Sequence, residues 1–205
     1  TLFRSSKKSF KGSAMLNPVP SVLITSKNKE EKVNVFTVGW IGVACTHPPM
    51  ISVAIRPERL SYKYIKENGE FVVNLPSRDL VKAVDFCGVK SGTTVDKIKE
   101  MNFTLEDSDN ISVPYIDECP ITLECKVKNI IPLGSHDLFL AEILSVHVEE
   151  DLIDEKGKIH YEKANLICYS HGEYFGVSKK VLGNFGFSIR KKKKKKKQNF
   201  KKKKK

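Results

Sequence analysis

The sequence predicts a mainly β protein, a single-domain closed or split β-barrel with a few short helices at its edges. Three observations predict this class. Apolar, β-branched segments recur at short spacing along the chain. The second half consists mostly of such segments. Between two unusual ends lie roughly 180 residues, which is the size of one ordinary domain.

The lysine-rich end accounts for the net charge of +12. Residues 190–205 hold 13 of the 36 Lys and Arg residues, which leaves 23 basic against 24 acidic residues, or −1. A translated poly-A run would read as lysine, and a sequencing-adapter end would read as the initial TLFRS. We expect residues 1–9 and the disordered tail 190–205 to be non-native, and residues 10–189 to form the domain. The alternative is a native polybasic tail that binds nucleic acid or a membrane surface.

The first half of the domain contains four segments that are apolar and rich in β-branched residues. These predict strands at residues 21–26, 33–40, 50–55 and 71–76. Pro48 and Pro49 remove two backbone donors just before the third segment. That point is therefore expected to be an edge or the entry to a strand.

Three short helices are expected between and after these strands. The first lies within residues 61–71 and ends at Asn68-Gly69. The second covers residues 77–88, with Ser77 as its N-cap and Gly88 as its C-cap. The third covers residues 95–103.

The second half predicts long strands at residues 121–133 and 136–150, joined by a hairpin turn at Gly134-Ser135. Residues 165–177 complete the set of strands. No internal repeat and no Gly- or Ser-rich linker divides the sequence, which agrees with a single domain.

Several functional classes have no supporting motif in this sequence. It lacks a GxGxxG dinucleotide fingerprint, a phosphate loop ending in GK[ST] and a GxSxG nucleophile elbow. The five histidines and five cysteines show no metal-ligand spacing, so no metal is expected. An odd number of scattered cysteines fits the reducing cytoplasm. With no apolar run near the length of a membrane span, no membrane association is expected from the body.

Trp40 is the only tryptophan and lies between Gly39 and Gly42, on a connection between apolar segments. A tryptophan here can fill a core, because its side chain buries a large apolar area. It can also form a platform for a flat ligand, since the nearby glycines let a ligand approach the backbone. Composition and spacing leave both interpretations open.

Five stretches, taken in order, resemble the flavin reductase-like family in its flavoredoxin-type branch. They are FKGSAMLNPVPSVLITS, VNVFTVGWIGVACTHPPMISVAIRPERLSYKYIKENGEFVVNLPS, VDFCGVKSGTTVDK, GSHDLFLAEI and GNFGFS. The resemblance runs from about Phe10 to Ser188. It implies a split β-barrel that binds FMN, usually as a homodimer with the flavin near the dimer interface.

By the same resemblance, the connection after the second strand contacts the isoalloxazine ring or its tail. The residues implied there are Asn34, Thr37, Val38 and Trp40. Cys45 and Thr46 match positions that line the same pocket, although Cys45 taken alone reads as a small buried residue. His136 and Tyr169 match positions associated with the flavin, and residues 85–92 match a loop that closes over the site.

The phosphate of FMN is expected at the start of the first helix. The resemblance implies that Ser61 binds it, with Arg56 pairing to its oxygens and Tyr62 adding a backbone amide. Lys97 matches a lysine that reaches the flavin, where a cation stabilises the reduced ring. From the residues alone, Ser61 reads as a helix cap, Arg56 as a surface arginine and Lys97 as an exposed helix lysine.

The resemblance implies flavin-dependent electron transfer, either as an NAD(P)H-dependent flavin oxidoreductase or as an FMN carrier between redox proteins. The cofactor carries this chemistry, so no catalytic acid or base is assigned. A non-catalytic FMN-binding or sensor module is the alternative within the same fold. With the body close to neutral, no nucleic-acid binding is expected from it.

Overall fold

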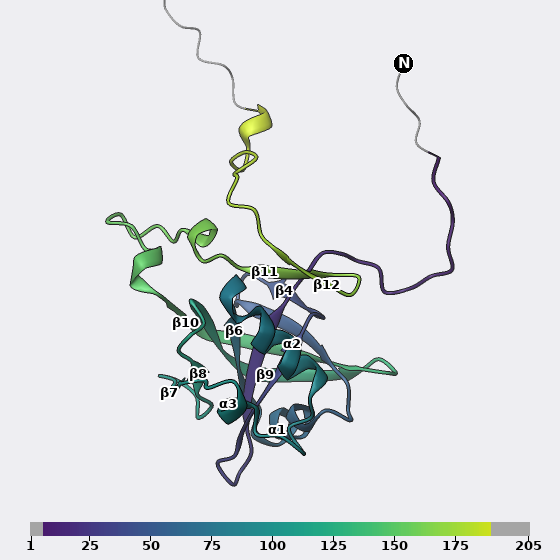
Figure 1. The fold of residues 1–205 in the computed structure, drawn as a ribbon, viewed down its shortest axis with the longest axis vertical. Helices are drawn as coiled ribbons and strands as arrows, with labels where there is room; N and C mark the ends of the chain where they lie inside the picture. The colour runs from purple at the N-terminus through teal and green to yellow at the C-terminus, as the bar shows by residue number, and fades with distance from the viewer. Residues whose placement is uncertain (1–5, 190–205) are drawn as a thin grey trace, which may run out of the picture.

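The computed structural model of the chain describes residues 6–189. Its largest element is an antiparallel sheet with strand order β3-β2-β6-β9-β10-β5-β4 (Figure 1). The architecture is mainly β, as predicted. The strands are β2 Val22–Lys27, β3 Val33–Val38, β4 Ile41–Cys45, β5 Met50–Ile55, β6 Glu70–Leu75, β9 Ile121–Pro132 and β10 Asp137–Val148.

The two edge strands of this sheet, β3 and β4, are separated in sequence by Gly39 and Trp40 alone. Six strand spacings in a flat sheet would place its edges about 29 Å apart. The three Cα steps from Val38 to Ile41 cover at most about 11 Å. The sheet must therefore roll up until its edges approach, which gives a barrel that is split along the β3–β4 seam, as expected.

The rolled sheet encloses an apolar core, to which each strand contributes alternate residues. Val22 and Ile24 of β2 lie in this core, whereas Leu23 between them packs on the outer face. Helix α1, Leu60–Asn68, packs on the core through the fully buried Ile65. Burial of one such side chain stabilises the fold by about 1.5–3 kcal/mol. Gly69 ends α1 in a left-handed conformation, as Asn68-Gly69 predicted.

Two further helices cover the outer face of β2 and β3, where they pack on a second apolar cluster. They are α2, Val81–Val89, and α3, Lys97–Glu100. Ser77 caps the 3-10 helix η1, Arg78–Leu80, which leads into α2. The prediction of Gly88 as a C-cap was wrong, because α2 continues through it to Val89. A Cβ at Gly88 would lie 3.3 Å from that of Thr37, so this glycine serves close helix–strand packing.

The remaining strands form two small sheets. β1, Val19–Pro20, pairs with β11, Ile167–Ser170, which continues into the hairpin strand β12, Glu173–Gly176. β7, Leu105–Glu106, pairs with β8, Tyr115–Ile116. The segments before β1 and after β12 leave the body on the same side, beside β11 and β12 (Figure 1). Short 3-10 helices complete the fold: η2 Glu150–Leu152, η3 Tyr161–Lys163 and η4 Phe187–Ile189.

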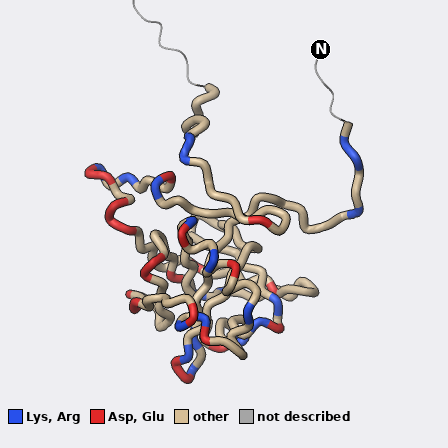
Figure 2. The backbone as a smooth tube through the Cα atoms, in the orientation of Figure 1, with Lys and Arg blue, Asp and Glu red and all other residues tan. Residues whose placement is uncertain are grey.

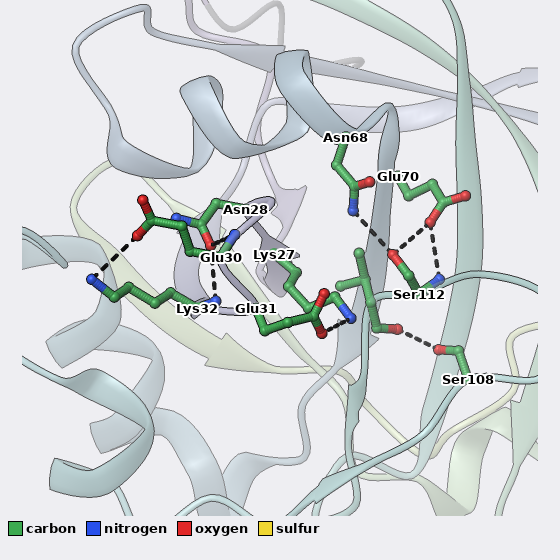
Figure 3. A network of polar contacts seen from close by, with 10 residues as sticks. Lys27, Asn28, Glu30, Glu31, Lys32, Asn68, Glu70, Ser108 and Ser112 are labelled. Atoms are coloured by element: carbon green, nitrogen blue, oxygen red, sulfur yellow. Dashed lines mark hydrogen bonds and ion pairs between the residues drawn. The ribbon is translucent and has the colours of Figure 1, made fainter.

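The connection between β7 and β8, here called the 107–114 segment, lies over β6. Ile111 and Val113 pack against Val72 of that strand. Ser112 donates two hydrogen bonds to one oxygen of Glu70, both 2.9 Å, and accepts a third from Asn68 (Figure 3). These contacts fasten the segment to the end of α1 and the start of β6.

Charges of both signs are interspersed along the described chain, as the near-neutral count of the body predicts (Figure 2). Within residues 6–189, no helix is long and apolar enough to span a bilayer. The expectations for residues 1–5 and 190–205, which include the lysine tail, lie outside the described residues.

Candidate functional site

Two adjoining cavities open beside the β3–β4 seam. The first has a volume of about 460 Å³ and the second about 400 Å³. Phe36, Arg56 and Arg59 line both, so the two cavities adjoin, and together they are here called the groove. The groove lies between the end of β3, the end of β5 and the C-terminal half of α2.

The first cavity is lined by strand residues and aromatic residues. The end of β3, where Thr37 and Val38 lead into Gly39, and Ala54 and Ile55 of β5 line it. Trp40, Tyr169 and Tyr174 contribute rings. The remaining lining residues are Ser21, Phe36, Arg56, Arg59, Asp85, Gly88, Val89 and His136. Such a mixture of aromatic and polar residues suits a flat, partly polar ligand.

Trp40 occupies the seam itself. Its carbonyl accepts a hydrogen bond from the Ala54 amide at 2.9 Å, which fixes this backbone against β5. The side chain is 39% exposed and lines the cavity. Trp40 is therefore not enclosed in the core, and its use as a platform for a ligand stays a prediction.

The hairpin β11–β12 forms one wall of the first cavity and is hydrogen-bonded to α2. Tyr169 and Tyr174 meet edge to face with centroids 5.5 Å apart, and the Tyr174 hydroxyl donates to Asp85 at 3.2 Å. Burial, followed by the Asp85 charge, raises the pKa of Tyr174 to about 12. The hydroxyl therefore stays protonated near pH 7 and can donate to Asp85 there.

His136 lies between the two strands of the long hairpin and lines the first cavity. Its Nδ1 is 2.9 Å from the Ser135 hydroxyl. Burial, followed by the Arg56 charge, lowers the pKa of His136 below its ordinary value. The His136 ring is therefore neutral near pH 7.

The second cavity is lined mainly by cations and hydroxyl groups. Arg56, Arg59, Lys90 and Lys97 supply positive charge, and Glu58 is the one acidic residue among the described lining residues. Glu58 lies 3.4 Å from Arg56, which partly neutralises that arginine. The other lining residues are Asn34, Phe36, Leu60, Ser61, Ser91 and Gly92. The arrangement suits an anion that accepts several hydrogen bonds.

Ser61 lies at the start of α1 and is fully buried. Its oxygen accepts hydrogen bonds from Asn34 Nδ2 at 2.7 Å and from the Ser26 hydroxyl at 2.8 Å. A serine oxygen has two acceptor positions and one hydrogen to donate. With both acceptor positions filled, the hydroxyl keeps one hydrogen to donate, and Ser61 lines the second cavity.

Lys97 is the first residue of α3 and is only 4% exposed. Its ammonium donates to the Cys87 carbonyl, in the last turn of α2, at 3.1 Å. Burial is the main cause that lowers the pKa of Lys97 from 10.5 to about 8, and Arg59 adds to it. A buried cation of this kind suits a cavity that receives an anion.

The structure brings most of the residues predicted from the sequence to the groove. Thr37, Val38, Trp40, Arg56, His136 and Tyr169 line the first cavity, and Asn34, Arg56, Ser61 and Lys97 line the second. Lys97 and Asn34 therefore lie on the anion side, not beside Trp40. Residues 85–92 are expected to be a closing loop, but they form the end of α2 and the turn after it.

Three predicted residues lie away from the groove as this single chain forms it. Cys45 ends the edge strand β4, and Thr46 lies in the turn that follows. The Tyr62 side chain packs in the core and donates to Asp137 at 2.7 Å. The Tyr62 amide donates to the Arg59 carbonyl at 3.1 Å, so it is already occupied.

Several lining residues were not predicted individually, chief among them Arg59 and Tyr174, and Asp85 was predicted only as part of the 85–92 segment. Arg59 directly precedes α1, so its place before a helix start was a usable signal. Asp85 and Tyr174 are 89 positions apart in sequence. Their contact depends on how the β11–β12 hairpin folds back over α2, and no local pattern signals it.

A family model described as a flavin reductase like domain matches residues 15–178. An uncharacterised protein of Archaeoglobus fulgidus is 38% identical over 147 residues, which cover 72% of this chain and 82% of that protein. An uncharacterised protein of Pyrococcus abyssi is 32% identical over 170 residues, covering 83% and 96%.

Among solved structures, the fold is similar to two flavoredoxins. The flavoredoxin of Desulfovibrio vulgaris has a TM-score of 0.83 and 28% identity, covering 89% of this chain and all of that one. The flavoredoxin of Methanosarcina acetivorans has a TM-score of 0.81 and 28% identity, covering 91% and 100%. Nitrilotriacetate monooxygenase component B of Bacillus cereus has a TM-score of 0.74 and 28% identity, covering 81% and 87%.

Proposed function

Because this chain belongs to the flavin reductase-like family, we propose that it is a flavoprotein that binds FMN along the whole groove. We further propose that it transfers electrons through this FMN, with NAD(P)H or a redox protein as the donor. The observation that carries the proposal is the pairing of an aromatic cavity with a cationic one. FMN has the same two parts, a flat ring and a phosphate dianion.

The isoalloxazine ring is assigned to the first cavity. Trp40 and Tyr169 provide aromatic surface, and the backbone of Thr37 and Val38 faces the polar edge of the ring. The Thr37 hydroxyl donates to the Val84 carbonyl, which holds β3 against α2 beside this position. His136 supplies an uncharged nitrogen toward the ring or the chain that follows it.

The phosphate is assigned to the second cavity. Arg59 and Lys97 provide charge, and Ser61 provides the hydroxyl hydrogen that remains after its oxygen has accepted two bonds. The α1 start adds the positive end of a helix dipole. Asn34 acts indirectly by holding Ser61 in position, while Cys45, Thr46 and Tyr62 are left out of the proposed site.

Bound FMN would supply the hydride and single-electron chemistry. The protein would hold the ring between Trp40 and the β11–β12 hairpin and would anchor the phosphate. Electron transfer is favoured over a purely structural role for the flavin because the matching family model is described as a flavin reductase like domain. A non-catalytic sensor is the second candidate.

We also propose that the protein forms a homodimer. The segment after β12 carries side chains that are strongly exposed in the single chain, such as Leu182 at 90%, and Phe10 before β1 is 80% exposed. Apolar side chains in such number on extended segments are typical of a surface that another chain covers. Both segments leave the body beside the β11–β12 wall of the groove (Figure 1).

The first test is the visible spectrum of protein that lacks residues 190–205, before and after added FMN. We expect flavin bands, and an affinity for FMN well above that for riboflavin, which lacks the phosphate. Arg59→Met should weaken FMN binding by about tenfold or more, because it removes a charge-assisted contact, and should weaken riboflavin binding much less. Lys63→Met, an exposed site on α1, is the matched control.

Anaerobic addition of NADH or NADPH to the same holoprotein distinguishes the roles. Bleaching of the flavin bands supports an NAD(P)H-dependent oxidoreductase. Bands that bleach only with a protein donor support an FMN carrier, and bands that no donor bleaches support the sensor. A colourless protein that takes up no FMN would overturn the flavin assignment altogether.

A further inference from the structure

Lys97 is buried without a carboxylate partner among the described residues. Its ammonium meets a backbone carbonyl, that of Cys87, at the C-terminal end of α2. The charge there is only the partial one of an unpaired carbonyl. An isolated ammonium is costly to bury, and in practice such a group loses its proton more readily.

The charged groups around Lys97 come from each element that packs near it. The stretch before α1 contributes Arg56, Glu58 and Arg59, and the turn after α2 contributes Lys90. Glu58 is occupied by Arg56. The Cys87 thiol of α2 is buried, which raises its pKa to about 11, so it is neutral over the range that matters here. The surroundings therefore add positive charge and lack a fixed counter-charge.

We propose that phosphate binding in the second cavity is coupled to the uptake of one proton by the Lys97 amine. The inference rests on the proposed function, since it takes the FMN phosphate as the anion. It adds that the empty site holds a lysine that easily becomes neutral, and that the dianion restores its charge. The affinity for FMN therefore depends on pH through the protonation state of Lys97.

The pH window of the coupling follows from the two states of Lys97. In the empty site, burial lowers its pKa to about 8. An adjacent phosphate dianion favours the ammonium and raises that pKa, so the bound state holds more protons above pH 8. The dissociation constant for FMN should then rise roughly tenfold per pH unit above about pH 8, until the pKa of the bound state is reached.

Other groups titrate outside this window. A phosphate monoester has its second pKa near about 6, so its own titration lies on the acid side. Arginine remains protonated throughout. Riboflavin has no phosphate. The pH dependence of its affinity therefore measures the effect of all other titrating groups of the protein and of the ring.

The experiment measures dissociation constants for FMN and riboflavin from pH 6.5 to 9.5, by quenching of flavin fluorescence. Wild-type protein and Lys99→Met, an exposed lysine on the same helix, should show the tenfold slope for FMN and none for riboflavin. Lys97→Arg should bind FMN with a flat profile, since its charge persists. Lys97→Met should bind FMN weakly at pH 7, with a flat profile and unchanged riboflavin affinity.

Calorimetry at pH 8.5 in two buffers of different ionisation enthalpy gives the proton count directly. Uptake of about three quarters of a proton per FMN in wild type, as a pKa of about 8 in the empty site requires at this pH, and none in Lys97→Met, supports the inference. Tight FMN binding with no proton uptake, or a slope that survives in Lys97→Met, overturns it and leaves the proposed function intact. If FMN does not bind at pH 7 in wild type, the proposed function itself fails.

Discussion

Buried polar side chains at the start of α1 form a chain of hydrogen bonds that shapes the second cavity. Ser26 and Asn34 donate to Ser61, and Gly92 lies directly against Asn34. A buried polar group that loses its partner costs about 1–3 kcal/mol. The chain is therefore a rigid support for one hydroxyl, and Asn34, which holds that hydroxyl, also lines the second cavity.

Gly92→Ala should disrupt this support. The new Cβ would lie 2.1 Å from Asn34 Oδ1 and 2.7 Å from its Cγ, so Asn34 must move and release Ser61. We expect the free energy of unfolding to fall by about 1–3 kcal/mol, measured by urea denaturation, and FMN affinity to fall with it.

Gly42→Ala is the matched control, because no described atom apart from its chain neighbours lies within 4 Å of the Cβ it would gain. Equal stability of Gly92→Ala and wild type would show that Asn34 can move freely and that the support is not rigid.

For individual residues, the sequence predicted which ones reach the groove better than it predicted how deeply they are buried. Ser61, Arg56 and Lys97 were singled out by resemblance, and all three reach the groove. Their burial could not be predicted, because it depends on α2 and the turn after it closing over α1. The exposed-lysine interpretation of Lys97 was wrong for this reason.

Among the elements, the 107–114 segment is held by two carboxylates on neighbouring strands. Glu70 of β6 accepts from Ser112, and Glu124 of β9 accepts from the amides of Asp109 and Asn110 at 2.8 and 2.9 Å. His147 of β10 adds a bond to Glu124 at 2.6 Å and stacks on Tyr115. The segment thereby shields polar groups on the outer face of the sheet, which would otherwise be exposed to water.

Glu124→Gln should loosen this segment and destabilise the fold by about 2 kcal/mol near pH 7. Although burial by itself raises the pKa of Glu124, bonds from His147 and the two amides outweigh it and lower the pKa below its ordinary value. The stabilisation is thus complete above the unfolded pKa and is lost as pH falls through the lower, folded one. Urea denaturation at several pH values measures it.

Glu142→Gln is the control, because its pair with Lys128 is partly exposed and should contribute less than about 1 kcal/mol. A stability difference between Glu124→Gln and wild type that does not shrink toward low pH would contradict the assignment to the carboxylate charge.

Most elements were predictable, and the exceptions have physical reasons. The long hairpin and α1 appear where the sequence placed them. β4 was missed because it is an edge strand with an exposed Val43 and a glycine, so its pattern is weak. β5 is interior, and Pro48-Pro49 mark its entry. A buried Glu124 breaks the alternation rule because the 107–114 segment covers it.

For the whole molecule, the order of strands could not be deduced from periodicity. Local patterns predict hairpins, but the neighbours β2–β6 and β10–β5 are distant in sequence. The split barrel was expected from the spacing of strands together with the family resemblance. The adjoining cavities are a consequence of that closure.

The proposed homodimer gives a test at this scale. Protein lacking residues 190–205 should have twice the monomer mass by light scattering after size exclusion. Removal of residues 179–205 also deletes Leu182 and Phe185, which are strongly exposed in the single chain, and should shift the mass toward monomer. A monomer in both cases would contradict the dimer, and a dimer in both would place its interface elsewhere.

The two-residue junction at the seam also turns Trp40 into a built-in optical reporter. It is the one tryptophan of the chain, so all indole emission comes from the point where the first and last strands of the rolled sheet meet. Unrolling of the sheet and filling of the groove would each change the polarity around the same indole. Emission colour and quenching by iodide can therefore follow barrel opening and ligand entry without any added label.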